Sequence, residues 1–206
     1  GNLLRLIDAK LNTTDYTYDI FSNLTSVTDA SGNRTEYEYD SHGNVILIRD
    51  PLLNETHFAY ALVGNTRSIT DARGNSTSFT YDGLDRLTRI TYPDASTIKY
   101  AYDAVGNRTS ITDPKGNVTT YAYDVANRLF QVIDALSGKT NYGYDTEGNQ
   151  IGITDANRET TRYTYDNLNR LTEASTPLLN KTQFSYDAAG NRISTTDANG
   201  NTTAYT

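Results

Sequence analysis

A single tyrosine position recurs every 21 residues along this 206-residue chain. Its members are Tyr18, Tyr39, Tyr60, Tyr81, Tyr102, Tyr123, Tyr144, Tyr165 and Tyr186. Asp follows the tyrosine in eight of the nine cases, and Ala61 is the exception. Because no insertion or deletion breaks the interval, the chain is predicted to be a tandem array of about ten copies of one small unit.

A second aromatic column and an apolar column share this period. The second aromatic column lies two residues before the tyrosine and consists of Tyr16, Tyr37, Phe58, Phe79, Tyr100, Tyr121, Tyr142, Tyr163, Phe184 and Tyr205. The two aromatic columns hold 19 of the 22 aromatic residues, so they are predicted to form one structural ladder. The steadiest apolar column is Leu6, Val27, Ile48, Ile69, Ile90, Ile111, Val132 and Ile153. β-branched and aromatic residues favour a pleated surface.

Each repeat contains two strand-like stretches. In residues 116–124, Tyr121 and Tyr123 alternate with Ala122 and smaller residues. This period of two is typical of a strand with two unlike faces. Residues 106–113 form the other stretch of the same repeat.

Turns of the form D-x-x-G-N separate the stretches. Examples are residues 29–33, 71–75, 103–107 and 113–117. Asp can accept a hydrogen bond from the backbone two residues on, and Gly accepts a positive φ. Positive φ is therefore predicted at Gly74, Gly116 and Gly200. Where Gly is missing, residues that tolerate the left-handed region often replace it, as at Asp85, Asn127 and Asn169.

The simplest fold for this pattern is all-β, with each repeat a β-hairpin in a curled or spiral antiparallel sheet. An odd repeat of 21 residues would swap the sheet faces of successive repeats. One net β-bulge per repeat, close to a Gly turn, is therefore predicted to restore the register. The alternative is a parallel β-solenoid, whose 21-residue coils would stack identical columns about 4.8 Å apart without a bulge.

A sheet with a Tyr/Ile face cannot leave that face in water. The sheet is predicted either to curl on itself or to be covered by another structure, because no helical layer is encoded. Tyr121 and Tyr123 are expected on one face with Ile111 nearby, and all three are expected to be largely buried.

Composition excludes several function classes. The net charge of −7 argues against nucleic acid, which demands clustered Lys and Arg. No apolar run approaches the roughly 20 residues that span a bilayer. The absence of Cys removes disulfides, thiolate metal sites and a Cys nucleophile. Position 1 is Gly rather than Met, which indicates a processed product or a fragment.

Residues 106–124 and 186–205, which begin G-N-R-T-S-I-T-D and Y-D-A-A-G-N-R, resemble the YD/Rhs repeat. This family includes bacterial Rhs and insecticidal Tc toxin proteins and the animal teneurins. The resemblance implies hairpins that wind into a hollow spiral shell. In bacterial members the shell encloses a toxic C-terminal domain, and in teneurins it belongs to an extracellular adhesion protein. This sequence shows repeats only, so enclosure of cargo is not implied for it alone.

Residues 1–206 are interpreted as one array without separate domains. The array is expected to belong to, or to continue into, a longer array. Neither end carries the polar capping unit that repeat arrays normally need, so the residues after Thr206 are expected to begin with Tyr-Asp in phase with the repeat.

The sequence offers little for catalysis or cofactor binding. The only histidines, His42 and His57, do not recur and belong to no catalytic motif. The many Asp residues start turns, which explains them without chemistry. The alternative interpretation is that stacked turn carboxylates bind Ca²⁺ weakly. No catalytic, cofactor-binding or metal residue is assigned, and no enzyme activity or cofactor is predicted.

N-x-S/T sequons occur nine times, at Asn12, Asn23, Asn33, Asn54, Asn75, Asn107, Asn117, Asn180 and Asn201. Seven of them occupy the exit of the second turn of a repeat, which predicts a surface row along one edge. They can carry N-glycans if the source glycosylates the protein. Alternatively, turn Asn and strand Thr create sequons through the repeat alone.

Two function classes follow. The first is a non-enzymatic structural segment of an extracellular or cell-surface shell, tube or fibre, which self-associates head to tail or laterally. The second is an adhesion module that recognises glycans or proteins through its Tyr face or turn edges, or a portion of a toxin-encapsulating shell.

Overall fold

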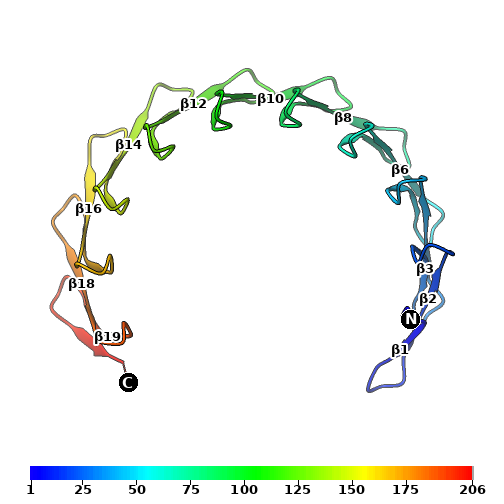
Figure 1. Cartoon of the computed structure of the whole chain (residues 1–206), viewed down its shortest axis with the longest axis horizontal. Coiled ribbons are helices and arrows are strands. Elements are labelled where there is room, and N and C mark those ends of the chain that lie inside the picture. Colours follow the sequence, from blue (N-terminus) through cyan, green and yellow to red (C-terminus); the bar gives the residue numbers. More distant parts are fainter. Residues whose placement is uncertain (206) are drawn as a thin grey trace. The chain divides into compact units, whose positions relative to one another are not determined.

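The computed structural model describes residues 1–205, which form twenty short β-strands joined by tight turns (Figure 1). No helix occurs among these residues, so none is present there that could cross a membrane. The chain divides into two compact units, Gly1–Lys99 and a second unit that begins at Tyr100. The boundary falls within β10 (Thr97–Tyr102).

The first unit contains β1 (Arg5–Ile7), β2 (Thr13–Tyr18), β3 (Leu24–Thr28), β4 (Arg34–Tyr39), β5 (Val45–Arg49), β6 (Glu55–Tyr60), β7 (Thr66–Thr70), β8 (Ser76–Tyr81) and β9 (Leu87–Thr91). The second contains β11 (Arg108–Thr112), β12 (Val118–Tyr123), β13 (Leu129–Ile133), β14 (Lys139–Tyr144), β15 (Gln150–Thr154), β16 (Thr160–Tyr165), β17 (Leu171–Ser175), β18 (Lys181–Tyr186), β19 (Arg192–Thr196) and β20 (Thr202–Ala204).

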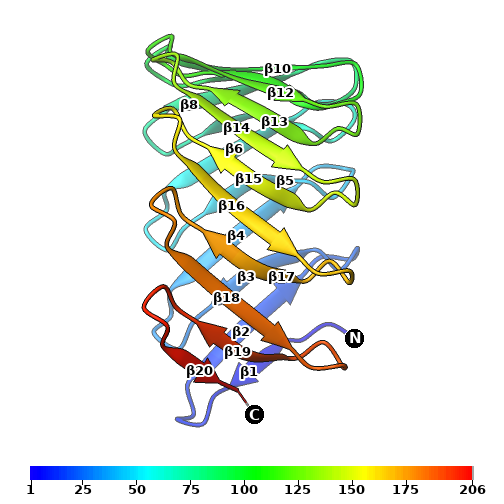
Figure 2. The same ribbon diagram turned by 90° about the vertical axis from the view of Figure 1, so that its left-hand side faces the viewer.

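Within each unit, every strand pairs antiparallel with its neighbours in sequence. In the first unit β3 pairs with β2 and β4, and in the second β13 pairs with β12 and β14. Figure 2 shows strands of the second unit side by side, with turns along two opposite edges. The predicted all-β hairpin fold is therefore confirmed, and the parallel solenoid is wrong.

The predicted bulge occurs once in each of eight repeats. Thr17 pairs with Ser26, but Tyr18 pairs with Leu24, so Thr25 is an extra residue on β3. The same shift lies beside the tyrosine in seven further hairpins. It adjoins the turn that follows the tyrosine. The extra residue offsets the odd repeat length, so the aromatic columns stay on one face.

Each repeat has two turns with the same backbone. The first turn follows the tyrosine, as in Asp19–Asn23, and the second follows the next strand, as in Asp29–Asn33. In both, the first residue donates its N–H to the fifth and accepts a bond from the N–H of the fourth. The fourth residue has positive φ in all nineteen turns within residues 1–205. The predicted positive φ at Gly74, Gly116 and Gly200 is confirmed.

Burial is partial along the aromatic face. Tyr121, Tyr123 and Ile111 lie on one face as expected, and each keeps some exposure to solvent. The single buried large apolar residue within residues 1–205 is Leu47, which pairs with Glu38 and therefore lies on the face opposite the tyrosines. A sheet one layer thick gives its residues neighbours on few sides. Each unit is held mainly by contacts along the sheet rather than by an enclosed core.

Candidate functional site

The Asp that begins most turns clamps its own loop. In the first turn of one repeat, Asp19 Oδ1 accepts hydrogen bonds from the N–H groups of Phe21 and Asn23, both at 2.8 Å. Its Oδ2 accepts a bond from Asn23 Nδ2 at 2.9 Å. The Asn23 amide, helped by the backbone donors, lowers the pKa of Asp19. The second turn at Asp29 is clamped by Asn33 in the same way.

The repeating tyrosine ties each repeat to the one before it. Tyr39 Oη donates a hydrogen bond to the carbonyl of Leu24 at 2.8 Å, next to the bulge residue Thr25. The equivalent bond, always to the residue fifteen positions earlier, is made by Tyr60, Tyr81, Tyr123, Tyr144, Tyr165 and Tyr186. A bulge disrupts the ladder locally, and the phenol supplies a hydrogen bond there. We call this contact the tyrosine latch.

Some first turns are also joined to the next first turn by an arginine. Arg128 Nε donates to Asp124 Oδ2 at 2.7 Å, and its Nη1 donates to the carbonyl of Asp145 at 3.1 Å. Its guanidinium carbon lies 4.7 Å from the centre of the Tyr144 ring. Arg170 repeats this arrangement with Asp166, Asp187 and Tyr186. The guanidinium fills the groove between two successive first turns.

Other pairs of first turns are bridged by an asparagine. Asn107 Nδ2 donates to Asn127 Oδ1 at 3.0 Å, and Asn149 Nδ2 donates to Asn169 Oδ1 at 2.9 Å. In the first unit, Asn65 Nδ2 bonds the carboxylate of Asp85 at 3.0 Å. Each acceptor is the positive-φ residue of its turn, so a residue chosen for backbone conformation also supplies a cross-turn contact.

Two consecutive grooves in the first unit have neither the arginine link nor the asparagine bridge. They lie between the first turns that begin at Asp19, Asp40 and Ala61, whose fifth residues are Asn23, Asn44 and Asn65. The next turn has Gly43 or Gly64 at its fourth position, which offers no side chain to bridge to. The first groove encloses about 740 Å³ and the second about 390 Å³. We call them the open grooves.

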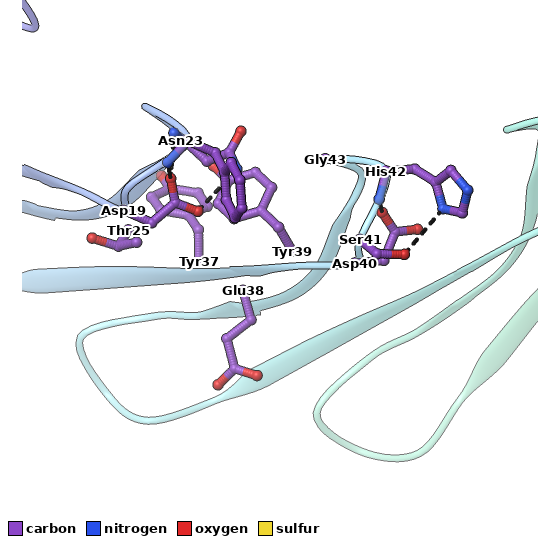
Figure 3. Close-up of a pocket in the computed structure, with 11 residues that line it drawn as sticks. Asp19, Asn23, Thr25, Tyr37, Glu38, Tyr39, Asp40, Ser41, His42 and Gly43 are labelled. Carbon is purple, nitrogen blue, oxygen red and sulfur yellow. Dashed lines mark hydrogen bonds between the residues drawn. The ribbon is translucent and has the colours of Figure 1, made fainter.

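The first open groove is drawn in Figure 3. Asp19 and Asn23 face Tyr37 and Tyr39, while the side chain of Glu38 points to the other side of its strand. The exposed Phe21 also lines this groove, and the exposed His42 lines both open grooves. Aromatic rings and a turn carboxylate therefore surround an open recess.

The structure places the two histidines apart. His42 lies at the tip of a first turn, and His57 lies on β6 with its Nε2 3.2 Å from Glu55 Oε2. Glu55 also pairs with Arg49. The residues that the structure describes contain no cluster of three or more His, Cys, Asp or Glu side chains suited to a metal ion.

The sequons lie at turn exits, as predicted from the repeat. Eight of the nine asparagines donate their Nδ2 to the carboxylate of the Asp that begins the turn; these are Asn12, Asn23, Asn33, Asn54, Asn75, Asn107, Asn117 and Asn201. The turn of Asn180 begins with Thr176 instead, whose hydroxyl accepts from the Asn180 N–H. The sequon asparagines are therefore structural parts of their turns.

Sequence reasoning missed the latch and the grooves. The latch requires knowledge of which carbonyl lies across the sheet, which the 21-residue spacing does not give. The arginine-filled grooves, in contrast, can be recognised from the sequence. From Asp82 onward, every second first turn has an arginine at its fifth position; these are Arg86, Arg128 and Arg170, a period of 42 residues.

Comparison with known proteins agrees with this geometry. The RHS Repeat family model matches residues 1–32, 21–52, 62–97, 102–139, 144–178 and 180–206. The chain therefore belongs to the RHS repeat family. No curated protein sequence matches it.

Solved structures include similar folds. The Tc holotoxin pore of Photorhabdus luminescens is 17% identical and covers 92% of this chain with a TM-score of 0.62. A TcdB2–TccC3–Cdc42 complex is 16% identical over 90% of the chain, with a TM-score of 0.42. This chain spans 13% and 14% of the lengths of those chains. The first likeness supports the hairpin-repeat fold.

Proposed function

We propose that this chain is a non-enzymatic structural segment, a stretch of wall in an extracellular shell, tube or fibre. The observation that supports the proposal is the tyrosine latch. It recurs at 21-residue intervals and joins a repeat to the one that precedes it. Stability then grows by addition of similar units and neighbour contacts, as in other repeat arrays. Such a design suits a surface that must be extended rather than a single reaction centre.

Three further features belong to this proposal. Residues 1–206 act as one array within a longer repeat protein, which is consistent with the small share of the toxin chain that they match. The protein acts outside the cell or on its surface, as the resemblance to toxin and adhesion proteins implies. Copies self-associate head to tail or laterally, because every repeat offers the same latch partners to a neighbour.

Electron microscopy combined with sedimentation of the purified chain tests the wall role. We expect particles that lengthen with concentration at the width of one repeat sheet if assembly is head to tail, and particles that widen if assembly is lateral. A monodisperse monomer at every concentration would contradict the proposed self-association. A compact particle in the full-length protein, with these repeats outside any wall, would overturn the structural role.

An adhesion module is the second candidate, and the open grooves favour it. Their aromatic and polar lining can stack against and hydrogen-bond a sugar ring or a peptide side chain. A glycan array together with a protein pull-down separates the two functions. The adhesion module is supported if the unassembled chain binds a glycan or protein and if Phe21→Ala or His42→Ala abolishes that binding.

A further inference from the structure

We propose that the two open grooves bind arginine side chains of a partner peptide. The chain itself contains the template for this complex. In the second unit, an intramolecular guanidinium occupies the groove that follows Asp124 and the groove that follows Asp166. The proposal concerns a partner and stands apart from the wall role, so either can fail without the other.

The open grooves match the arginine-filled grooves position by position. The second open groove has Asn44 at the position of Arg128. Its carboxylate is Asp40, in the place of Asp124, and its ring is Tyr60, in the place of Tyr144. The carbonyl of Ala61 takes the place of the Asp145 carbonyl. The groove that begins at Asp19 corresponds in the same way, with Tyr39 and the carbonyl of Asp40.

The fourth residue of the following turn completes the match. Arginine-filled grooves are followed by Gly148 and Gly190, and the open grooves by Gly43 and Gly64. Gly148 and Gly190 have positive φ and no side chain that could bridge back to the preceding turn, and Gly43 and Gly64 share both properties. Bridged grooves are followed by Asp85, Asn127 or Asn169 instead. The open grooves therefore have the lining residues of the arginine type without the arginine.

The vacant recess keeps the chemistry that a guanidinium requires. Asp19 Oδ2 accepts one bond from Asn23, and a carboxylate oxygen has capacity for a second donor. Tyr39 and Tyr60 line the open grooves, and their equivalents Tyr144 and Tyr186 lie beneath guanidinium groups in the second unit. Arginine stacks on such rings better than lysine does. The chain carries a net charge of −7, which favours a cationic ligand.

The spacing of the grooves points to the form of the partner. Successive first turns are two strands apart, which is about 9.6 Å at the usual strand separation. A polyproline II segment advances about 9.3 Å per three-residue turn and places every third side chain on one side. A segment of the form Arg-Pro-Pro-Arg therefore presents two guanidinium groups to the two grooves.

The test uses the full 206-residue chain and the capped peptide Arg-Pro-Pro-Arg, followed by NMR amide shifts and calorimetry at low salt. We expect binding with shifts centred on Gly43 and Gly64, and affinity for a peptide with one arginine that is at least about tenfold weaker. Peptides with lysine or with neutral citrulline should bind at least about tenfold more weakly as well.

Variants that fill the grooves supply the control. Asn23→Arg with Asn44→Arg places the chain's own guanidinium groups in both grooves and should abolish peptide binding. Asn33→Arg with Asn54→Arg adds the same charge to matched D-x-x-x-N second turns and should leave more than half of the affinity. Asn44→Gln, which keeps its groove open, should retain binding.

Each contrary outcome overturns the proposal. These are no binding at millimolar peptide, equal binding of the arginine and lysine peptides, and equal loss in the two arginine double variants. The last two results would indicate general attraction to an acidic surface. NMR spectra of every variant establish that it is folded.

Discussion

The two edges of the hairpin array share a backbone but differ in what connects their turns. First turns are joined to their neighbours by arginine or asparagine side chains in several repeats, and the latch and bulge lie beside them. Second turns, such as Asp113–Asn117, are clamped internally by their own Asp and Asn. Within residues 1–205, no side-chain bond joins one second turn to the next. The same turn therefore bonds to neighbouring turns at one edge and is stabilised only by its own residues at the other.

The residues with positive φ reflect this difference. At first turns the non-glycine residues are Ser22, Asp85, Asn127 and Asn169, which are small and polar. At second turns they are Leu11, Leu53, Ala95, Ser137, Arg158 and Leu179. Leu in the left-handed region costs roughly 1–2 kcal/mol. The second-turn edge tolerates that strain, whereas the first-turn edge uses the position for contacts between repeats.

Acid gives the largest expected effect because it removes the clamps at both edges. Asn donors lower the pKa of Asp19 at a first turn and of Asp29, Asp50 and Asp71 at second turns. A lowered folded-state pKa gives stability that is fully present above the unfolded pKa of about 3.9, and it is lost as pH falls through the folded value. Circular dichroism should show stability falling steeply below about pH 4. Stability independent of pH in this range would show that the clamps contribute little.

Removal of a latch comes next. Tyr144→Ala should lower the free energy of unfolding by about 2–3 kcal/mol, because it removes a half-buried ring and the bond to Leu129. Tyr144→Phe isolates the hydroxyl and should cost about 1 kcal/mol. The matched control is Tyr142→Phe, whose hydroxyl makes no hydrogen bond within residues 1–205 and should change stability little. Denaturant titration measures all three, and equal effects of the two Phe variants would contradict the latch.

The arginine link should have a somewhat smaller effect. Arg128→Ala removes two hydrogen bonds and the contact with Tyr144, and should cost about 1–2 kcal/mol. Asn44→Arg should stabilise the first unit by about 0.5–1 kcal/mol, because it fills an open groove. Asn54→Arg at the second-turn edge provides the comparison and should give no gain. Thermal unfolding of the three variants decides whether the groove distinguishes the edges.

Glycine substitutions at positive φ should give the smallest effects, of opposite sign at the two edges. Leu53→Gly relieves strain at a side chain that is 75% exposed, and should stabilise by roughly 0.5–1 kcal/mol after the unfolded-state entropy is included. Asn127→Gly removes the bridge to Asn107 and should destabilise by a few tenths to about 1 kcal/mol. Chemical denaturation would contradict the comparison if both substitutions stabilised the chain.

The sequence predicted features that depend on local chemistry and missed those that depend on the path of neighbouring strands. The period of Tyr18 and its relatives gave the hairpins, the D-x-x-G-N motif gave the positive φ, and the odd repeat length gave the bulge. The sequence did not predict that Tyr39 reaches Leu24, because the acceptor is a backbone carbonyl without a side-chain signature. The sequence also did not show that the aromatic face would lack a second layer, which leaves Tyr121 partly exposed.

The grooves between first turns could be predicted only in part from the sequence. Arg128 and Arg170 are visible in the sequence at a 42-residue interval, but each looks like an ordinary surface charge until Tyr144 and Tyr186 are placed beneath them. The open grooves were hidden for the same reason. Asn23 and Asn44 fit the repeat motif, and only the comparison with the arginine turns shows what their grooves lack.

Native-state hydrogen exchange tests most directly whether the first-turn edge connects the repeats. The amides to compare are Gly148 and Gly190, which close first turns next to an arginine link, and Gly116 and Gly200, which close second turns; all four donate to the Asp that begins their turn. Their bonds are similar, at 3.2 and 3.1 Å against 3.0 Å for both second turns. Differences in protection therefore report on how the turns open. We expect Gly148 and Gly190 to exchange only with opening of the adjoining repeats, and Gly116 and Gly200 to exchange through faster local opening. Equal protection at the two edges, unchanged by Arg128→Ala, would contradict it.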